Sequence, residues 1–181
     1  MLAKRIRHIV PICFLVLFAA GTGQADVNGS SDPEPLLSAQ GLFEGYIYFT
    51  DTKRTGLKSE TLRLPADLNM LELGQQIIEA LLNGPTRDGL VPLWPAGARL
   101  NAFYITDQGD AFVDLALTPD MIEAMDVQTE LLTVYSMVNS LGVNIPGIRQ
   151  VKILLQGRDA QTLAGHVDLN FFYQTNMLIV K

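Results

Sequence analysis

The chain has 181 residues, and its 13 lysines and arginines are outnumbered by 19 aspartates and glutamates, for a formal net charge of −6. An acidic chain without a cluster of basic side chains repels phosphate backbones, which argues against nucleic acid as a partner. This length leaves room for one globular domain besides a targeting segment and a linker.

The first 25 residues have the pattern of a signal peptide. Three basic residues, Lys4, Arg5 and Arg7, precede an apolar run over 9–20. Small residues then occupy the positions that a signal peptidase recognises, which predicts cleavage between Ala25 and Asp26. We therefore expect an exported protein that works in the periplasm or outside the cell.

The apolar run is too short for a permanent anchor, because its 12 residues fall below the roughly 20 that a membrane-spanning helix needs. We expect no stable membrane span after cleavage. Cleavage would also remove Cys13, the one cysteine of the chain, and this excludes disulfides, thiolate metal sites and a cysteine nucleophile. With 10 of the 13 basic residues left against 19 acidic ones, the formal charge becomes −9.

Three segments follow the signal peptide. Residues 26–40 are rich in turn formers and are predicted to be a flexible linker. Residues 41–170 have the size of a single domain. Residues 171–181 form a hydrophobic C-terminal extension, which has to pair with a sheet edge, cover a gap in the core or meet a partner.

The first half of the domain predicts a hairpin and a helix. Alternating residues favour strands over 43–49 and 57–64. Asn69 and Glu72 have capping-box spacing at the start of a helix that ends at Asn83-Gly84-Pro85. Gly74 lies on the buried side of that helix, where it predicts a close approach to a strand.

The second half repeats this order. Two alternating runs, over 99–106 and 111–117, flank a polar turn and predict a second hairpin. Thr118-Pro119-Asp120 is typical of a helix start, and apolar residues continue at helical spacing to Leu141, just before Gly142. A last strand is expected over 148–155.

These elements predict an α+β fold. We expect a single small sheet, mixed or antiparallel, with one face covered by two α-helices.

Particular residues, beyond their periodicity, resemble a known family. The stretches that carry the resemblance are Tyr48-Phe49-Thr50-Asp51, Leu81-Leu82-Asn83-Gly84-Pro85, Pro95-Ala96-Gly97-Ala98-Arg99-Leu100, Val113-Asp114-Leu115, 151–157 and 162–169. In their order and spacing they resemble the GerMN domain family of spore germination and sporulation proteins, over about 43–170. The matching positions, interpreted as structural, are Tyr48, Phe49, Leu82, Gly84, Pro85, Pro95, Gly97, Asp114, Gly157, Thr162, Leu163, Gly165, His166 and Asp168.

The resemblance implies an exported envelope protein without known enzymatic activity. It also implies a fold similar to ring-building modules, which pack two helices on a small sheet and associate with copies of themselves or with neighbours. Partners would then be proteins or further copies of the chain, with peptidoglycan as another candidate.

An enzyme is the competing hypothesis, in the form of a hydrolase acting on cell-wall material in the periplasm or outside the cell. His166 and Asp168 stand two apart, hence on one side of any strand, and could form a general-base pair. The sequence has no Gly-x-Ser-x-Gly nucleophile elbow, so we interpret His166 as structural. Asp110 is expected to shape a turn, and Asp114 to face solvent or cap a backbone group.

Cofactor and metal sites have less support. After cleavage one histidine remains, and the chain has no Asp-x-Asp-x-Asp-Gly loop. Arg158-Asp159 suggests a phosphate contact, but no glycine-rich loop leads into a helix nearby. We therefore predict neither a cofactor nor a metal.

Exposed aromatic residues would favour a binding module. Tyr46, Tyr48 and Trp94 are expected to lie mostly in the core, whereas 171–173 lie beyond the last family motif. The sequence thus favours a non-enzymatic envelope module for assembly or binding.

Overall fold

The computed structural model describes residues 41–118, 121–122 and 125–181, which belong to one compact unit. The predicted signal peptide, the Ala25–Asp26 junction, Cys13 and the 26–40 linker lie outside the described residues. The elements, in chain order, are β1 (Leu42–Asp51), β2 (Leu57–Pro65), α1 (Met70–Asn83), β3 (Leu90–Val91), β4 (Arg99–Ile105), β5 (Asp110–Ala116), α2 (Val127–Asn144), β6 (Gln150–Leu155), β7 (Arg158–Asp159) and the short 3-10 helix η2 (Met177–Ile179).

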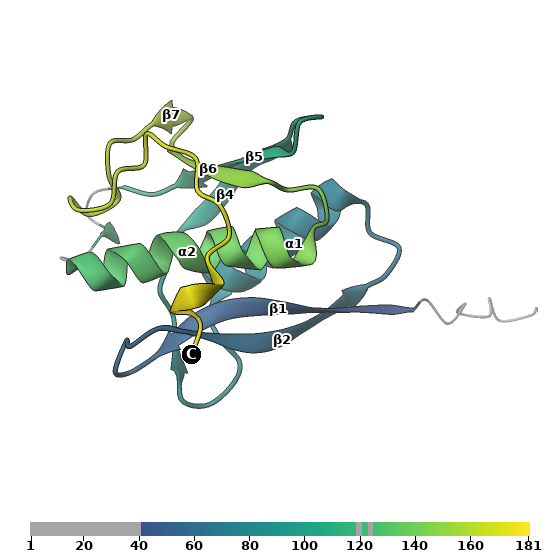
Figure 1. Ribbon diagram of the computed structural model, residues 1–181, viewed down its shortest axis with the longest axis horizontal. Helices are drawn as coiled ribbons and strands as arrows, with labels where there is room; N and C mark the ends of the chain where they lie inside the picture. The colour runs from purple at the N-terminus through teal and green to yellow at the C-terminus, as the bar shows by residue number, and fades with distance from the viewer. Residues whose placement is uncertain (1–40, 119–120, 123–124) are drawn as a thin grey trace, which may run out of the picture. The chain divides into compact units, whose positions relative to one another are not determined.

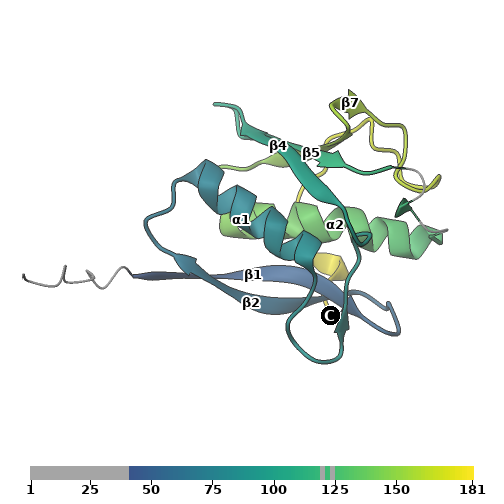
Figure 2. The same cartoon turned by 180° about the vertical axis from the view of Figure 1, so that it is seen from behind.

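The α+β class is confirmed, but the expected single sheet is wrong, because the strands form two sheets. One has the strand order β2-β1-β3 and the other β4-β5-β6-β7. Both helices lie between the two sheets, as the opposite views show (Figure 1, Figure 2). Each sheet therefore has one face covered by helices, and the main hydrophobic core includes residues from both sheets and both helices.

Side chains of α2 explain why the sheets stay separate. Asn144 pairs with both polar groups of the Tyr46 backbone: Tyr46 N donates to Asn144 Oδ1 at 2.9 Å, and Asn144 Nδ2 donates to Tyr46 O at 2.6 Å. Tyr48 N donates to Ser140 Oγ at 3.0 Å. The helix thus occupies the β1 edge where a further strand would have paired. Farther along β1, Thr50 and Asp51 pair with β3.

The boundaries of α2 correct a second prediction. The helix begins after Asp126, whose carboxylate accepts the Thr129 N–H at 2.7 Å, and not at Thr118-Pro119-Asp120. Residues 119 and 120 are not described. Gly142 lies inside the helix, which continues to Asn144. The absence of a side chain there lets the C-terminal segment pass close by, since a Cβ at Gly142 would come within 2.1 Å of Thr175 Oγ1.

The predicted capping box of α1 is confirmed, since Asn69 accepts from Glu72 N and Glu72 accepts from Asn69 N, each at 3.0 Å. Gly74 is buried against β4, where an added Cβ would lie 2.1 Å from the ring of Phe103. The close approach that the sequence predicted at this glycine therefore exists.

Replacing Gly74 with alanine is expected to lower the free energy of unfolding by about 1–3 kcal/mol, because the added methyl group displaces the Phe103 ring. At other positions inside a helix, replacing glycine with alanine raises the free energy of unfolding by about 1 kcal/mol. Urea unfolding monitored by circular dichroism measures the difference. Phe103→Leu should relieve the clash and reduce the loss in the double variant. If Gly74→Ala alone stabilises the protein, the close approach between Gly74 and the Phe103 ring is contradicted.

The C-terminal segment, residues 171–181, packs across the domain. Tyr173 pairs with Val151 of β6 through two 2.8 Å backbone hydrogen bonds, and Lys181 N donates to Leu57 O at 2.9 Å. Between these ends, Asn176 pairs with the Asn139 side chain of α2. We call residues 173–181 the C-terminal strap, since they join one sheet to the other across α2 (Figure 1).

Candidate functional site

The most unusual polar group of the domain is Glu130, a fully buried glutamate in the first turn of α2. Its carboxylate accepts backbone N–H groups from Leu163 at 3.0 Å, Ala164 at 2.8 Å and His166 at 2.9 Å. The His166 ring nitrogen Nδ1 also lies 2.9 Å from it. Glu130 therefore holds the loop over 161–169 against the start of the helix.

These contacts set the charge of Glu130. Burial acts to raise the pKa of its carboxyl group, but hydrogen bonds from the Ala164 and His166 backbones and from the His166 ring outweigh it, and the net pKa lies below the ordinary value. Glu130 is thus an anion that accepts hydrogen bonds. It is not a protonated general acid poised near neutral pH.

The predicted pair of His166 and Asp168 does not form. His166 lies on Glu130, whereas the Asp168 carboxylate accepts from the Asn170 backbone at 2.8 Å and side chain at 2.9 Å. The Tyr173 hydroxyl donates to the Asp168 carbonyl at 2.7 Å. Both residues shape the end of the domain.

Asp114 and the turn after β6 form a second arrangement of the same kind. Asp114 accepts the Gly157 N–H at 2.7 Å. Of the two roles expected for this carboxylate, it therefore caps a backbone group. Gln156 and Gly157 both have positive φ, 54° and 74°, which reverses the chain between β6 and β7. Asp110 accepts from Gln150 at 2.9 Å and pairs with Arg149 at 3.3 Å.

A third carboxylate, Glu60 on β2, is also largely buried and holds the loop after α1. It accepts the Thr86 hydroxyl at 2.6 Å and backbone N–H groups of Thr86 and Arg87 at 3.0–3.1 Å. Burial acts to raise the pKa of Glu60, but these bonds and the Arg87 charge lower it on balance. Sequence reasoning missed Glu60 and Glu130.

The sequence does contain a pattern that indicates the burial of Glu130. This residue falls on the helical stripe that runs through Val134, Met137 and Leu141, all fully buried. A charged residue within an otherwise apolar stripe indicates a buried, paired group. Its partners lie more than 30 residues later, and no periodicity reveals them.

The remaining family-motif positions lie in the core or at turns. Tyr48, Phe49 and Leu163 are buried. Gly84, Gly97 and Gly165 have φ of 89°, 86° and 108°, a backbone conformation that favours glycine. Pro85 follows the end of α1, Leu82 packs against the core, Thr162 bridges to Asp168, and Pro95 accepts the Ala98 N–H.

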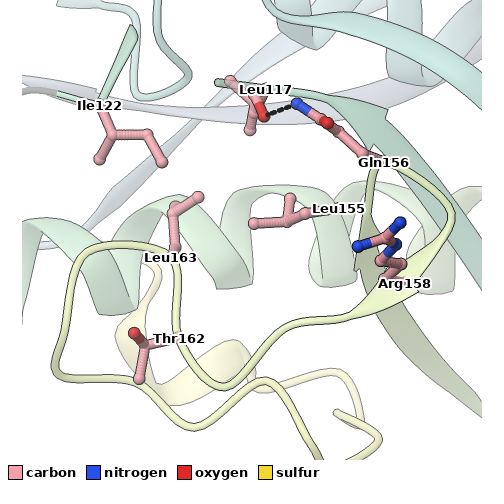
Figure 3. A pocket seen from close by; sticks show the side chains of 7 residues that line it. All are labelled: Leu117, Ile122, Leu155, Gln156, Arg158, Thr162 and Leu163. Carbon is pink, nitrogen blue, oxygen red and sulfur yellow. Dashed lines mark hydrogen bonds between the residues drawn. The ribbon is translucent and has the colours of Figure 1, made fainter. Parts of the chain in front are cut away.

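An open pocket of about 460 Å³ lies beside the loop that Glu130 holds. Its apolar part consists of Leu117, Ile122, Leu155 and Leu163, whose side chains are turned toward a common space in Figure 3. Its polar part consists of Gln156, Arg158 and Thr162. Gln156 Nε2 donates to the Leu117 carbonyl at 2.7 Å, which leaves the guanidinium of Arg158 as the charged group of the pocket.

Within the described residues, no group of three or more histidines, cysteines and carboxylates could hold a metal ion. A search of the same part of the chain for a helix with the length and apolar character of a membrane span finds none.

The fold and these contacts define a class: an α+β module in which buried carboxylates hold loops in place beside an open pocket with an aliphatic and a polar part. The sequence matches the model of the Germane family, described as sporulation and spore germination, over residues 46–161, and the chain belongs to that family. This confirms the GerMN-like resemblance.

Solved structures agree with this assignment. A candidate lipoprotein from Clostridium perfringens is 27% identical, with a TM-score of 0.53, and the match covers 74% of this chain and 88% of that one. The first GerMN domain of the sporulation protein GerM from Bacillus subtilis is 20% identical, with a TM-score of 0.58, over 74% and 98% of the two chains. The tandem GerMN domains of the same protein are 21% identical, with a TM-score of 0.56, over 71% and 44%. No curated protein sequence matches the chain.

Proposed function

We propose that this protein is a non-enzymatic, exported module of the cell envelope that binds other proteins or further copies of itself. The observation that carries the proposal is the use of Glu130: the one buried carboxylate beside the one histidine of the domain accepts three backbone N–H groups. A base of this kind is engaged in holding a loop, with little capacity left to accept a proton from a substrate.

The relatives support the location. One neighbour is described as a candidate lipoprotein and another as a sporulation protein, and the family description refers to sporulation and spore germination. Export to the periplasm or the cell exterior, with an association with sporulation or germination, is consistent with these descriptions and with the signal-peptide pattern.

The surface supports a role in protein contacts. Several large apolar side chains are exposed, among them Leu42 at 70%, Met70 at 58% and Tyr104 at 63%. Tyrosine and methionine side chains are enriched at interfaces between proteins.

Cross-linking in intact cells, followed by light scattering of the purified protein, tests the assembly role. We expect cross-linked species that contain the chain with itself or with defined envelope proteins, and a mass in solution that rises with concentration if copies associate. A strict monomer that yields no cross-linked protein would contradict the proposal.

The hydrolase alternative has its own readout. His166→Ala and Asp114→Asn should leave cross-linking intact, provided that the variants remain folded by circular dichroism, and the wild-type protein should release no fragments from purified peptidoglycan. Release of fragments that stops in either folded variant would establish an enzyme instead.

A further inference from the structure

Arg158, at the pocket of Figure 3, is a charged side chain without a partner among the described residues. The ion pairs of this part of the chain join Arg63 to Glu44, Arg149 to Asp110, Lys152 to Asp159, and His166 to Glu130. The guanidinium of Arg158 takes part in none of them, and it is exposed at the wall of the pocket.

Two described carboxylates near Arg158 in the turn are already engaged. Asp159, the next residue, pairs with Lys152 at 3.0 Å, and Asp114 accepts the Gly157 N–H at 2.7 Å. In a chain with a net charge of −6, Arg158 is therefore a cation beside a pocket with no ion-pair partner among the residues that the structure describes. A guanidinium presents two parallel N–H groups, which fit the two oxygens of a carboxylate.

The apolar part of the pocket restricts the ligand further. Leu117 and Leu163 are only 3% and 6% exposed, and Leu155 and Ile122 complete the surface. A volume of about 460 Å³ is far more than one methyl group fills, and it falls within the range of small ligand sites. The ligand should carry an apolar group next to its carboxylate.

A polypeptide C-terminus that ends in leucine or a similar residue has this chemistry, and its extended backbone can lie along the Thr162 side of the pocket. We propose that the pocket binds the C-terminal end of a partner polypeptide, with the terminal carboxylate on Arg158 and the last side chain among Leu117, Leu155 and Leu163. This inference rests on the proposed function, because it specifies how the module would recognise a protein partner.

Fluorescence polarisation with two labelled hexapeptides tests the site. Both end in leucine, one with a free carboxylate and one with a C-terminal amide. We expect the purified wild-type protein to bind the free acid at least about tenfold more tightly than the amide, since only the acid forms the charge-assisted pair. Arg158→Gln should remove this difference, and Arg158→Lys should keep part of it.

The matched control is Arg99→Gln, which removes an exposed arginine at the start of β4, outside this pocket. It should leave the preference for the free acid unchanged. Equal affinities for the acid and the amide, an unchanged preference in Arg158→Gln, or no binding at millimolar protein would overturn the proposal.

Two further results separate this inference from the proposed function. If a peptide that ends in D-alanyl-D-alanine binds more tightly than the peptide that ends in leucine, the proposed terminal leucine-like side chain is wrong. The ligand would then be a peptide of the cell wall. Cross-links to envelope proteins that persist unchanged in Arg158→Gln would overturn the role of the pocket and leave the assembly function standing.

Discussion

Replacing Glu130 with glutamine is expected to lower the free energy of unfolding by about 2–4 kcal/mol, because a buried anion that serves four donors becomes a neutral amide. Glutamine has nearly the same shape but only one acceptor oxygen, and its NH₂ group would face a backbone N–H that it cannot satisfy. Urea unfolding of the two proteins measures the difference, and hydrogen exchange should show weaker protection at Leu163, Ala164 and His166.

Glu72→Gln provides the matched control. Glu72 is also in the first turn of a helix and also accepts a backbone N–H, that of Asn69, but it is exposed. Water can replace its hydrogen bond, so a much smaller loss is expected. Equal losses in Glu72→Gln and Glu130→Gln would show that burial of Glu130 does not matter.

The same carboxylate predicts how stability depends on pH. The folded-state pKa of Glu130 is depressed below the ordinary value of 4.5, so the unfolded chain binds the proton more readily. Its contribution is therefore fully present above about pH 4.5 and is lost as pH falls through the lower folded-state pKa. Glu60 and Asp126 have pKa values lowered in the same direction, so they act together with it.

Melting temperatures measured from pH 7 to pH 3 test this dependence. Wild-type protein should lose stability progressively below pH 4.5, and Glu130→Gln should show a shallower decrease in the same range. Parallel curves for the two proteins would mean that Glu130 titrates alike in the folded and unfolded states.

Local chemistry was predictable from the sequence, and long-range pairing was not. The capping box of Asn69 and Glu72 and the close approach at Gly74 depend on neighbouring residues and on the shape of glycine. The two hairpins and both helices follow from periodicity in the same way.

The division into two sheets depends on contacts that no local pattern contains. The prediction of one sheet placed both helices on one face of that sheet, whereas polar residues on several sides of α2 are buried and bind separate segments. Asn144 reaches Tyr46 across 98 positions of sequence, and Glu130 reaches His166 across 36. Such pairs become visible only once the fold has brought them together.

The second prediction concerns the contribution of the C-terminal strap to stability. Ile179 and Val180 pack against a hydrophobic cluster of Tyr48, Leu57, Leu93 and Leu132. Deleting residues 174–181 would uncover this cluster and leave the buried Asn139 amide without its two partners. We expect a loss of at least about 3 kcal/mol in the free energy of unfolding, measured by urea titration.

Two point variants separate the causes of that loss. Asn139→Ala should reproduce part of it, because Asn139 is fully buried and holds the strap through Asn176. Leu178→Ser should have little effect, since Leu178 is 86% exposed. A deletion as stable as the wild-type chain would mean that the strap contributes nothing to the fold.

The strap also determines how self-association has to be measured. A chain without residues 174–181 exposes Tyr48 and Leu57 to water, and apolar surface of that kind promotes aggregation whether or not the native protein forms oligomers. Truncation would therefore raise the mass in light scattering for reasons unrelated to function. Leu178→Ser in the full-length chain changes the exposed surface while it keeps the strap in place, so a fall in native oligomers in this variant would identify a real interface.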